Sequence, residues 1–584
     1  QPRRLELQLR ARRAVGDEHV RRRGDRDLLV VGGYVSNRPV MDQAERPHER
    51  PRHRHPEEPV RTADQQAHVA APAGEHPFVR DVVVSVAGHG WRGGHGPKGV
   101  PLSGARRLAI AGAPEWLCGQ GPQFPSMEVF GSSGVRGVVG EEMTPEFVLR
   151  IARAAGGRFH DDGLETVAVG RDTRLTGQML ADAASAGLSA VGCDVRRLGI
   201  VPTPGLQAYC ADVGMPGLVI TASHNPPSDN GVKLVGADGS ELSLVALERI
   251  EARLLADRQE RPTSSTGWRA LGAARPEPDV AAGYVEKLVA AEEGSLADAD
   301  LTVAIDPGHG AGALTSPDLF RRLGCRVITL NAQPDGRFPG RDPEPVASNL
   351  GDLATLVRTS AADIGIAHDG DADRAMFVDE TGAFVEGDVA LAVLARASLG
   401  ADDVTVSAVN VSQRLVEVAD AAGADLELTP IGSTHIVTRI RELQQAGERV
   451  PIAGEGNGGV LFPSYRLARD GAYTAMRLVA LVAERPLGEL VEPFDGYANV
   501  KLSLSLEHPD DREAMLGAIE RYANEADAEV TTIDGYRLDY GDGWVLARPS
   551  GTEPLMRLSA EAAVESRAQE LAAGLETAMR DAIE

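Results

Sequence analysis

From residue 144 onward, stretches typical of buried strands alternate with stretches that have the period of amphipathic helices. In the first such pair Thr144 is placed as an N-cap, Pro145 occupies the first helical position, and the apolar run 166–170 follows the helix. The alternation returns in 301–368 and again in 403–454. Strands that alternate with helices form a parallel or mixed sheet covered on both faces. The pattern therefore predicts an α/β fold.

The repetition of this pattern predicts several domains. Each repeat spans about 100–150 residues, which is an ordinary domain size. The last segment differs, with a strand-like run at 499–507, a helical stretch at 510–526 and a closing amphipathic helix. We expect three similar α/β domains with mixed sheets and a smaller C-terminal α+β domain around a central cleft, with catalytic loops at the carboxyl ends of strands. The expected boundaries are 127–278, 279–380, 381–492 and 493–584.

Charge is distributed unevenly along the chain. The first 126 residues hold 20 Lys and Arg against 14 Asp and Glu, whereas the remainder holds 40 basic and 71 acidic residues. An acidic, lysine-poor surface is typical of a protein adapted to high salt, as in haloarchaea, because carboxylates keep it hydrated while salt screens their repulsion. The same charge disfavours nucleic acid as a partner.

Residues 1–126 show no sustained helical or strand period and contain tracts such as "RPHERPRHRHPEEP". We expect a disordered arm, or an extension upstream of a true start at Met127; a basic RNA-binding arm is the alternative. No apolar run approaches the roughly 20 residues that span a bilayer. Four cysteines without metal spacing are expected to be reduced, buried and structural. We therefore expect a cytoplasmic protein with no membrane partner.

The segment "HDGDADR" follows an apolar run and carries three carboxylates at alternate positions, Asp369, Asp371 and Asp373. Such carboxylates can share one tight loop if a hard divalent cation offsets their repulsion, and Mg²⁺ favours carboxylate oxygens. A solvated acidic turn is the plain alternative. An EF-hand is another, because Glu380 lies at position 12 of that loop, but Arg374 stands where that loop needs glycine.

Ser223 closes an apolar run in "LVITASHNPPSDNGVKL" and is stiffened by the two prolines that follow. A serine fixed beside a metal suits a nucleophile or phosphate carrier, and Lys233 lies ten residues on. An N-capping serine in an ordinary turn is the alternative. A phosphatase with an aspartate nucleophile in the "DGDADR" loop would leave Ser223 without a task.

Two further loops carry groups that bind anions or sugars. In "ARPSGTEPLMR" a glycine turn and hydroxyls lie between two arginines, which suits a phosphate, although an ordinary turn has the same letters. In "GEGNGG", Glu455 and Asn457 could bind vicinal hydroxyls, or the loop could bind nothing. Arg136, Arg171 and Arg174 also lie on loops, where they indicate either anion binding or structural ion pairs.

Four of these motifs, "TASHNPPSDNGVK", "DGDADR", "GEGNGG" and "RPSGTEP", resemble in this order the four active-site loops of the α-D-phosphohexomutases. The family includes phosphoglucosamine mutases, phosphomannomutases and phosphoglucomutases. "FGSSGVRG", "GRDTR" and "GIVPTPG" are similar to its first-domain motifs. The similarity covers residues 127–584 and none of 1–126.

The resemblance implies an isomerase in which Ser223 is a phosphoserine that exchanges its phosphate with a hexose phosphate through a 1,6-bisphosphate. Glucose 1,6-bisphosphate would be an activator. The implied binding partner is a small-molecule sugar phosphate, and the protein would be a monomer or a homodimer. The implied Mg²⁺ ligands are the seryl phosphate, Asp369, Asp371 and Asp373. The other implied residues are catalytic Arg136, His224 and Lys233, and substrate-binding Arg374, Glu455, Asn457, Arg548, Ser550, Gly551, Thr552 and Arg557.

The sequence departs from many relatives in two loops. The sugar loop ends in Gly458 and Gly459 where they have Gly-His, and Ser433 stands where some have histidine. We therefore expect Lys233 to carry the proton, with its pKa lowered by neighbouring cations, and His435 as the second candidate. The sugar loop favours glucosamine 6-phosphate as substrate. Mannose or glucose phosphates are alternatives, and a non-catalytic sugar-phosphate or Ca²⁺-binding protein is the alternative of another class.

Overall fold

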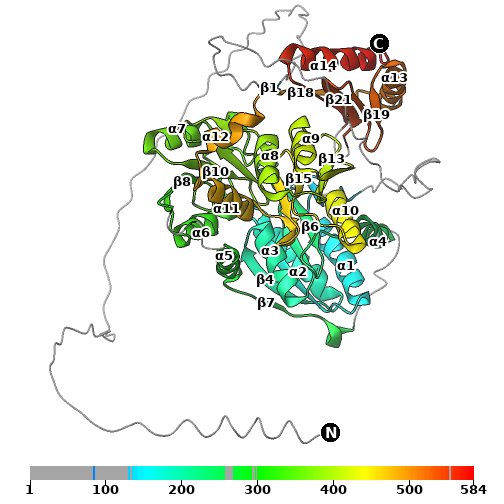
Figure 1. The fold of residues 1–584 in the computed structure, drawn as a ribbon. Coiled ribbons are helices and arrows are strands. Elements are labelled where there is room, and N and C mark those ends of the chain that lie inside the picture. Colours follow the sequence, from blue (N-terminus) through cyan, green and yellow to red (C-terminus); the bar gives the residue numbers. More distant parts are fainter. Residues whose placement is uncertain are drawn as a thin grey trace, which may run out of the picture. The chain divides into compact units, whose positions relative to one another are not determined.

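The computed structural model describes residues 83–85, 129–131, 134–256, 267–292, 296, 299–508, 510–550 and 554–584. Of residues 1–126 it describes only strand β1 (Val83–Ser85), which pairs antiparallel with a strand of the C-terminal sheet. The rest of our prediction for that segment lies outside the described residues. The described strands form four sheets, whose elements are labelled in Figure 1.

The first sheet has the strand order β2-β6-β5-β3-β4-β7 and is mixed. Its strands are β2 (Val135–Val138), β3 (Thr166–Arg171), β4 (Asp194–Ile200), β5 (Gly217–Ile220), β6 (Asp229–Val235) and β7 (Ala274–Pro276). Its helices are α1 (Pro145–Asp161), α2 (Gly177–Ala190), α3 (Thr203–Val213) and α4 (Leu244–Ala256).

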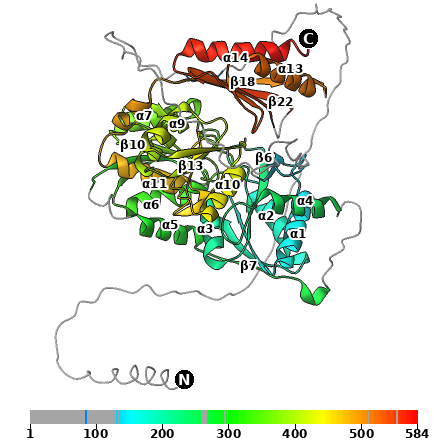
Figure 2. The ribbon, with the colours of Figure 1, turned by 45° about the vertical axis from the view of Figure 1, so that its right-hand side comes forward.

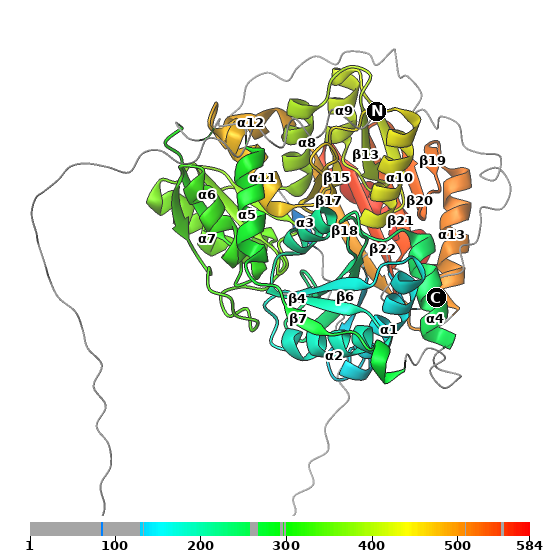
Figure 3. The same ribbon diagram turned by 90° about the horizontal axis from the view of Figure 1, so that it is seen from below.

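Helices cover both faces of this sheet, as the alternation predicted. Val167 and Val169 of β3 pack in one cluster with α1, α2 and α4, whereas Ala168 between them packs with α3 on the opposite face. Figure 3 shows α1, α2 and α4 grouped beside the strands. The N-terminus of α1 also follows the prediction, since Thr144 Oγ1 accepts a hydrogen bond from the Phe147 amide at 3.2 Å and Pro145 begins the helix.

The second sheet has the order β12-β11-β10-β8-β9 and the third the order β14-β13-β15-β16-β17. The second contains β8 (Thr302–Asp306), β9 (Arg326–Thr329), β10 (Ile364–His368), β11 (Ala375–Val378) and β12 (Phe384–Val385), with helices α5 (Val280–Ala291), α6 (Ser316–Arg322) and α7 (Gly351–Ser360). The third contains β13 (Val404–Ala408), β14 (Asp425–Thr429), β15 (Ala453–Glu455), β16 (Gly459–Phe462) and β17 (Arg466–Arg469). Its helices are α8 (Gly387–Ser398), α9 (Gln413–Ala422), α10 (Ser433–Ala446), α11 (Gly471–Val482) and α12 (Leu487–Val491).

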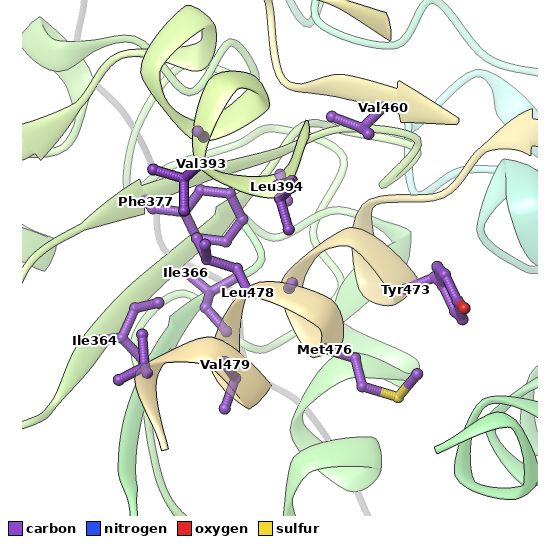
Figure 4. Packing of buried hydrophobic residues seen from close by; sticks show 14 of the residues in the cluster. Ile364, Ile366, Phe377, Val393, Leu394, Val460, Tyr473, Met476, Leu478 and Val479 are labelled. Carbon is purple, nitrogen blue, oxygen red and sulfur yellow. The ribbon is translucent and has the colours of Figure 1, made fainter. Parts of the chain in front are cut away.

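The second and third sheets share one hydrophobic core. Ile366 of β10 and Phe377 of β11 belong to the same buried cluster as Leu394 of α8, Val460 of β16 and Leu478 of α11. Figure 4 shows Phe377, Ile366, Leu394 and Leu478 close to one another, with Val460 farther to the upper right. This shared cluster stabilises the contact between the two domains, because separating them would expose large apolar side chains to water.

The fourth sheet is antiparallel throughout, with the order β1-β18-β22-β21-β20-β19. It consists of β1 with β18 (Ala498–Ser505), β19 (Glu529–Thr531), β20 (Tyr536–Asp539), β21 (Gly543–Pro549) and β22 (Leu555–Ala562). The helices α13 (Asp511–Glu525) and α14 (Glu565–Arg580) pack on it (Figure 2). The predicted class, three mixed α/β domains and a smaller α+β domain, is therefore confirmed.

Three of the cysteines, Cys193, Cys210 and Cys325, are buried and free, as expected, and Cys118 lies outside the described residues. Among the helices that the structure describes, none is long and apolar enough to cross a bilayer.

Candidate active site

The three loops singled out in the α/β domains occupy the same place in the topology of their sheets. In each sheet a parallel strand, β5, β10 or β15, is followed by an antiparallel neighbour, and the loop connects the two. Ser223 follows β5, the acidic loop follows β10, and Glu455 closes β15. The repeated topology thus places all three loops at the carboxyl end of equivalent strands, where ligands bind in open α/β sheets.

Ser223 is buried and has a left-handed backbone, with φ of 52° and 1% of its surface exposed. A non-glycine residue is strained in this region, so the surrounding contacts must hold it there. Its amide donates to Thr221 Oγ1 at 2.9 Å, and its hydroxyl donates to Asp369 Oδ2 at 2.6 Å. The structure therefore places the serine hydroxyl directly on the acidic loop, although 146 residues separate the two in sequence.

Asp369, Asp371 and Asp373 lie together and are at most 1% exposed, with one carboxylate oxygen of each within 4.8 Å of the others. The Oδ1 atoms of Asp371 and Asp373 are buried without a hydrogen-bond partner. Buried unpaired carboxylate oxygens are costly, and a divalent cation is the group that would satisfy them. The residues present therefore fit Mg²⁺. The alternative of a solvated acidic turn is excluded, because the three aspartates are buried.

The electrostatics of the three carboxyls differ. Burial, with the charges of Asp373 and Asp371 beside it, raises the pKa of Asp369 to about 8. Burial acts in the same direction on Asp373, but Arg469, Lys233 and Arg374 outweigh it and lower the pKa of that carboxyl.

Lys233 is buried between two of these carboxyls. Its Nζ lies 2.7 Å from Asp371 Oδ2 and 2.7 Å from Asp373 Oδ2. Burial favours the neutral amine, but Asp371 and Asp373 outweigh it and raise the pKa of Lys233. Our expectation that neighbouring cations would lower this pKa is therefore wrong for this arrangement, because the nearest charges are carboxylates. Lys233 is a protonated bridge in the acidic loop.

The remaining residues expected at the transfer site lie around this cluster. Arg136 Nη1 donates to Asn225 Oδ1 at 3.1 Å in the serine loop, and burial lowers the pKa of Arg136. Arg374 donates its amide to Asp369 Oδ1 at 3.3 Å. His224 Nδ1 lies 3.5 Å from the Ser223 hydroxyl, and burial together with Arg374 and Arg136 lowers the pKa of His224 to about 2. This imidazole is therefore neutral at neutral pH.

Arg171 and Arg174, for which anion binding and structural pairing were both open, make structural contacts. Arg171 Nη1 donates to the Asp172 carbonyl at 3.0 Å. Arg174 is 1% exposed and donates only to protein oxygens in the contacts described. The structural alternative holds for Arg174, which pairs with Asp172. Arg171 Nε is buried without a hydrogen-bond partner, so the role of Arg171 stays a prediction.

The sugar loop is buried and ordered by its own side chains. Asn457 Nδ2 donates to Glu455 Oε2 at 3.3 Å, and the Gly459 amide donates to Asn457 Oδ1 at 3.0 Å. Gly458 has φ of 85°, which favours glycine at the turn. Ser433 donates to Glu241 Oε2 at 2.6 Å and begins α10. His435 lies within the same helix, and burial lowers its pKa.

The sequence did not point to Arg469, although it joins three domains. Arg469 Nη2 lies 2.9 Å from Asp373 Oδ2 and 3.4 Å from Glu241 Oε1, and its Nη1 lies 3.7 Å from Glu455 Oε2. The side chain is 4% exposed, so these contacts form in a region of low dielectric. The adjacent charges Arg469 and Asp470, in the mostly uncharged stretch "LARDGAYTAM", were the available signal.

The fourth loop lies between the antiparallel strands β21 and β22. Arg548 and Arg557 are opposite each other in the register of these strands, which brings two positive charges to facing positions. Arg548 also pairs with Asp534 at 3.4 Å. Ser550 lines a cavity of about 370 Å³ together with Arg512. Gly551 and Thr552 lie outside the described residues.

Comparison with known proteins matches the sequence to one family along four consecutive segments. The family descriptions are "Phosphoglucomutase/phosphomannomutase, alpha/beta/alpha" domain I for 127–261, domain II for 282–382 and domain III for 386–497, and the C-terminal domain of the same family for 504–578. The chain therefore belongs to the phosphoglucomutase/phosphomannomutase family. It is accordingly a phosphohexomutase, and thus an isomerase.

Individual relatives agree with this assignment. A "Phosphoglucomutase/phosphomannomutase" of Thermococcus kodakarensis is 38% identical over 454 residues, which is 76% of this chain and 96% of the relative. A "Probable phosphoglucosamine mutase" of Methanopyrus kandleri is 41% identical over 448 residues, 76% of this chain and 95% of the relative. The crystal structure of a phosphoglucomutase/phosphomannomutase family protein from Burkholderia thailandensis has a TM-score of 0.66 at 28% identity and covers 78% of this chain and 98% of that chain.

Proposed function

We propose that this phosphohexomutase interconverts glucosamine 6-phosphate and glucosamine 1-phosphate, with Ser223 as the phosphate carrier. The observation that carries the proposal is the Ser223 hydroxyl, held 2.6 Å from Asp369 among three buried carboxyls. A serine needs a neighbouring cation or base to take part in phosphoryl transfer. The acidic loop supplies the ligands for that cation.

In the proposed reaction, phosphorylated Ser223 gives its phosphoryl group to the free hydroxyl of a hexose phosphate. The resulting hexose 1,6-bisphosphate turns within the site, and its other phosphate returns to Ser223. Mg²⁺ held by Asp369, Asp371 and Asp373 would neutralise charge on the transferring phosphoryl oxygens. Lys233, protonated at Nζ, is the candidate proton carrier: it would give its proton to Ser223 Oγ as the serine leaves and would recover a proton from the attacking sugar hydroxyl.

Two other loops have supporting tasks in this proposal. Glu455 and Asn457, preordered by their mutual hydrogen bond, would bind the sugar hydroxyls or amino group. Arg548 and Arg557, facing each other across two strands, would hold the phosphate that is not reacting, together with Ser550, Gly551 and Thr552. Arg136 and Arg374 are adjacent to the serine and acidic loops, and we place them at the transferring phosphate with His224 as a neutral neighbour.

Support for glucosamine as the sugar comes from relatives. Several archaeal sequences of 34–41% identity carry the name "Probable phosphoglucosamine mutase". The relative from Thermococcus kodakarensis, named for glucose and mannose phosphates, supports the second candidate, a phosphoglucomutase/phosphomannomutase.

The test is phosphorus NMR of the full chain in molar KCl with Mg²⁺ and a trace of glucose 1,6-bisphosphate. The 6-phosphates of glucosamine, mannose and glucose are supplied separately. We expect a 1-phosphate signal to grow fastest with glucosamine 6-phosphate and to be absent with Ser223→Ala. Fastest conversion of mannose or glucose phosphate would favour the second candidate. Release of free phosphate alone, or no change with any sugar, would contradict the proposed reaction.

A further inference from the structure

The loop that carries Ser223 is shaped by a single side chain from a different strand–helix connection. Arg174 follows β3 in the sequence, 49 residues before the serine, and its guanidinium is buried beneath the loop. Its Nη2 donates to the Ser223 carbonyl at 2.9 Å and to the Asn225 carbonyl at 2.6 Å. Its Nη1 donates to the carbonyls of Pro226 and of Asp229, the latter at 2.8 Å.

The fifth donor of this guanidinium is also used. Arg174 Nε donates to Asp172 Oδ2 at 3.1 Å, so all five N–H groups that an arginine possesses are bound to protein oxygens. The guanidinium has no donor left for a phosphate, whether on the serine or on a sugar. The guanidinium instead holds four backbone carbonyls of the serine loop around itself by hydrogen bonds. Without it, these carbonyl oxygens would lose their donors.

A second chain of contacts connects Arg174 to the serine amide. Asp172, which is fully buried, accepts from the Thr221 hydroxyl at 2.7 Å as well as from Arg174. Thr221 Oγ1 in turn accepts from the Ser223 amide at 2.9 Å. The amide and the carbonyl of Ser223 are therefore both fixed, on either side of the residue whose φ is 52°. These hydrogen bonds, one to the Ser223 amide and one to its carbonyl, supply the contacts that a serine in the left-handed conformation requires.

The same guanidinium also contacts the domain of the acidic loop. The ring of Phe338 lies 5.3 Å from the Arg174 guanidinium carbon, and a Cβ added to Gly370 would lie 2.6 Å from the Ser223 carbonyl oxygen. Arg174 thus holds the serine loop at the point where the acidic loop packs closely against it.

We propose that Arg174 is a positioning residue for phosphoryl transfer: it fixes Ser223 in its left-handed conformation so that the hydroxyl meets the acidic loop. The expected effect on turnover rests on the proposed function. The positioning of the serine loop by Arg174 does not depend on that function. Displacement of a reacting group by about 1 Å can cost about 100-fold in rate. Lysine cannot make the same hydrogen bonds as Arg174, because its ammonium has only three donors and lacks the fixed planar geometry of a guanidinium.

The first experiment compares Arg174→Lys with the wild type and with Arg414→Lys. Arg414 is a matched control, since it is also a buried arginine that donates to backbone carbonyls, those of Phe494 and Tyr497. Hydrogen exchange followed by mass spectrometry should show faster exchange of the peptide that spans residues 221–230 in Arg174→Lys and not in Arg414→Lys. Unchanged exchange in that peptide would overturn the proposal, whatever reaction the enzyme performs.

The second experiment measures turnover by the NMR assay. We expect kcat of Arg174→Lys to fall about 100-fold while KM changes less than about threefold, because substrate contacts are left intact. Full turnover of Arg174→Lys would overturn the catalytic consequence. Failure of the wild type to convert any sugar would contradict the proposed function, and the exchange data would still decide the positioning.

Two further variants distinguish positioning from general loss of fold. Millimolar guanidinium should restore part of the turnover of Arg174→Ala, since the free cation can occupy the vacated site. Thr221→Val, which removes only the hydroxyl between Asp172 and the Ser223 amide, should lower kcat in the same direction by a smaller factor. Absence of both effects in variants with a normal unfolding temperature would overturn the proposal.

Discussion

At the scale of single residues, the site depends on how buried charges are paired. Lys233 and Arg469 together face four acidic groups in a region almost closed to water, so that each cation offsets the charge of more than one carboxylate. A buried charge that loses its partner is strongly unfavourable. Substitutions here should therefore change both chemistry and local order.

Replacement of Lys233 by methionine should lower kcat by about 100-fold or more, because general acid–base groups contribute factors of this size. The variant also leaves Asp371 and Asp373 without their shared ammonium. The NMR assay measures the effect, and Lys287→Met is the control, since Lys287 lies on α5 and pairs with Asp212. Full turnover of Lys233→Met would end the assignment of the proton carrier to this residue.

The sequence identified Ser223, the three aspartates and the sugar loop because each stands in a contiguous motif beside a strand. It could not identify Glu241 or Arg469, because Arg469 is separated in sequence from Asp373 by 96 residues and from Glu241 by 228 residues. It also predicted the wrong direction for the pKa of Lys233, since this direction depends on which charges lie nearest in space. Such distances follow from packing between domains, which no local pattern encodes.

At the scale of elements, helices and strands agree closely with the predicted stretches. The helix predicted at 510–526 is observed as Asp511–Glu525, and the strand predicted at 499–507 as Ala498–Ser505. Capping residues and strand periodicity are local properties, which explains the agreement. The expected domain boundaries stay predictions.

The first turn of α8 contains Asp388, and burial raises the pKa of this carboxyl to about 6. The charged groups that act on it are Lys501, Glu561, Arg414 and Glu386. An unfolded aspartate has a pKa of about 3.9. Since the folded state holds the proton more tightly, the contribution of Asp388 to stability is full below about pH 4 and is lost as pH rises through about 6.

Asp388→Asn removes this titration. Its unfolding temperature should match that of the wild type near pH 4.5 and exceed it at pH 8. Calorimetry across this range checks the prediction, and Asp352→Asn, at an exposed site in the first turn of α7, controls for the general effect of removing a carboxylate. A constant difference between variant and wild type at all pH values would contradict the assigned pKa.

The hairpin of β21 and β22 makes a separate prediction for Arg557, which faces Arg548 across the two strands. Arg557→Ala should raise KM for the sugar phosphate about 10-fold, because a hydrogen bond to a charged group contributes about 1.5–3 kcal/mol. We expect little change in kcat, since the non-reacting phosphate is bound alike in ground and transition states. Arg567→Ala, on α14, provides the control. A fall in kcat at constant KM would contradict this role.

At the scale of the whole molecule, the C-terminal sheet is connected to the third domain by a buried ion pair. Arg414 Nη1 lies 3.3 Å from Glu561 Oε2, while Glu561 Oε1 accepts from the Gln413 amide at 2.7 Å and from Trp544 Nε1 at 3.3 Å. Glu561 is 1% exposed. One carboxylate therefore joins an arginine, a helix N-terminus and a tryptophan from two domains.

Glu561→Gln should destabilise this junction by about 3 kcal/mol, the usual cost of leaving one member of a buried ion pair alone. The expected result in calorimetry is a separate, earlier unfolding transition for the C-terminal domain. Glu565→Gln, at the exposed start of α14, should leave the trace unchanged. Unfolding of Glu561→Gln in a single transition at the wild-type temperature would contradict the importance of the junction.

The contacts of Arg469 also bear on how such enzymes can evolve. Glu241, Asp373 and Glu455 come from the first, second and third domains, and all three meet at this one guanidinium. If recombination replaces one of these domains with that of a distant homologue, the new domain has to bring an acidic group to the same point. Otherwise Arg469 loses one of its ion-pair partners. Although the chain is modular in topology, its first three domains are therefore constrained to change together.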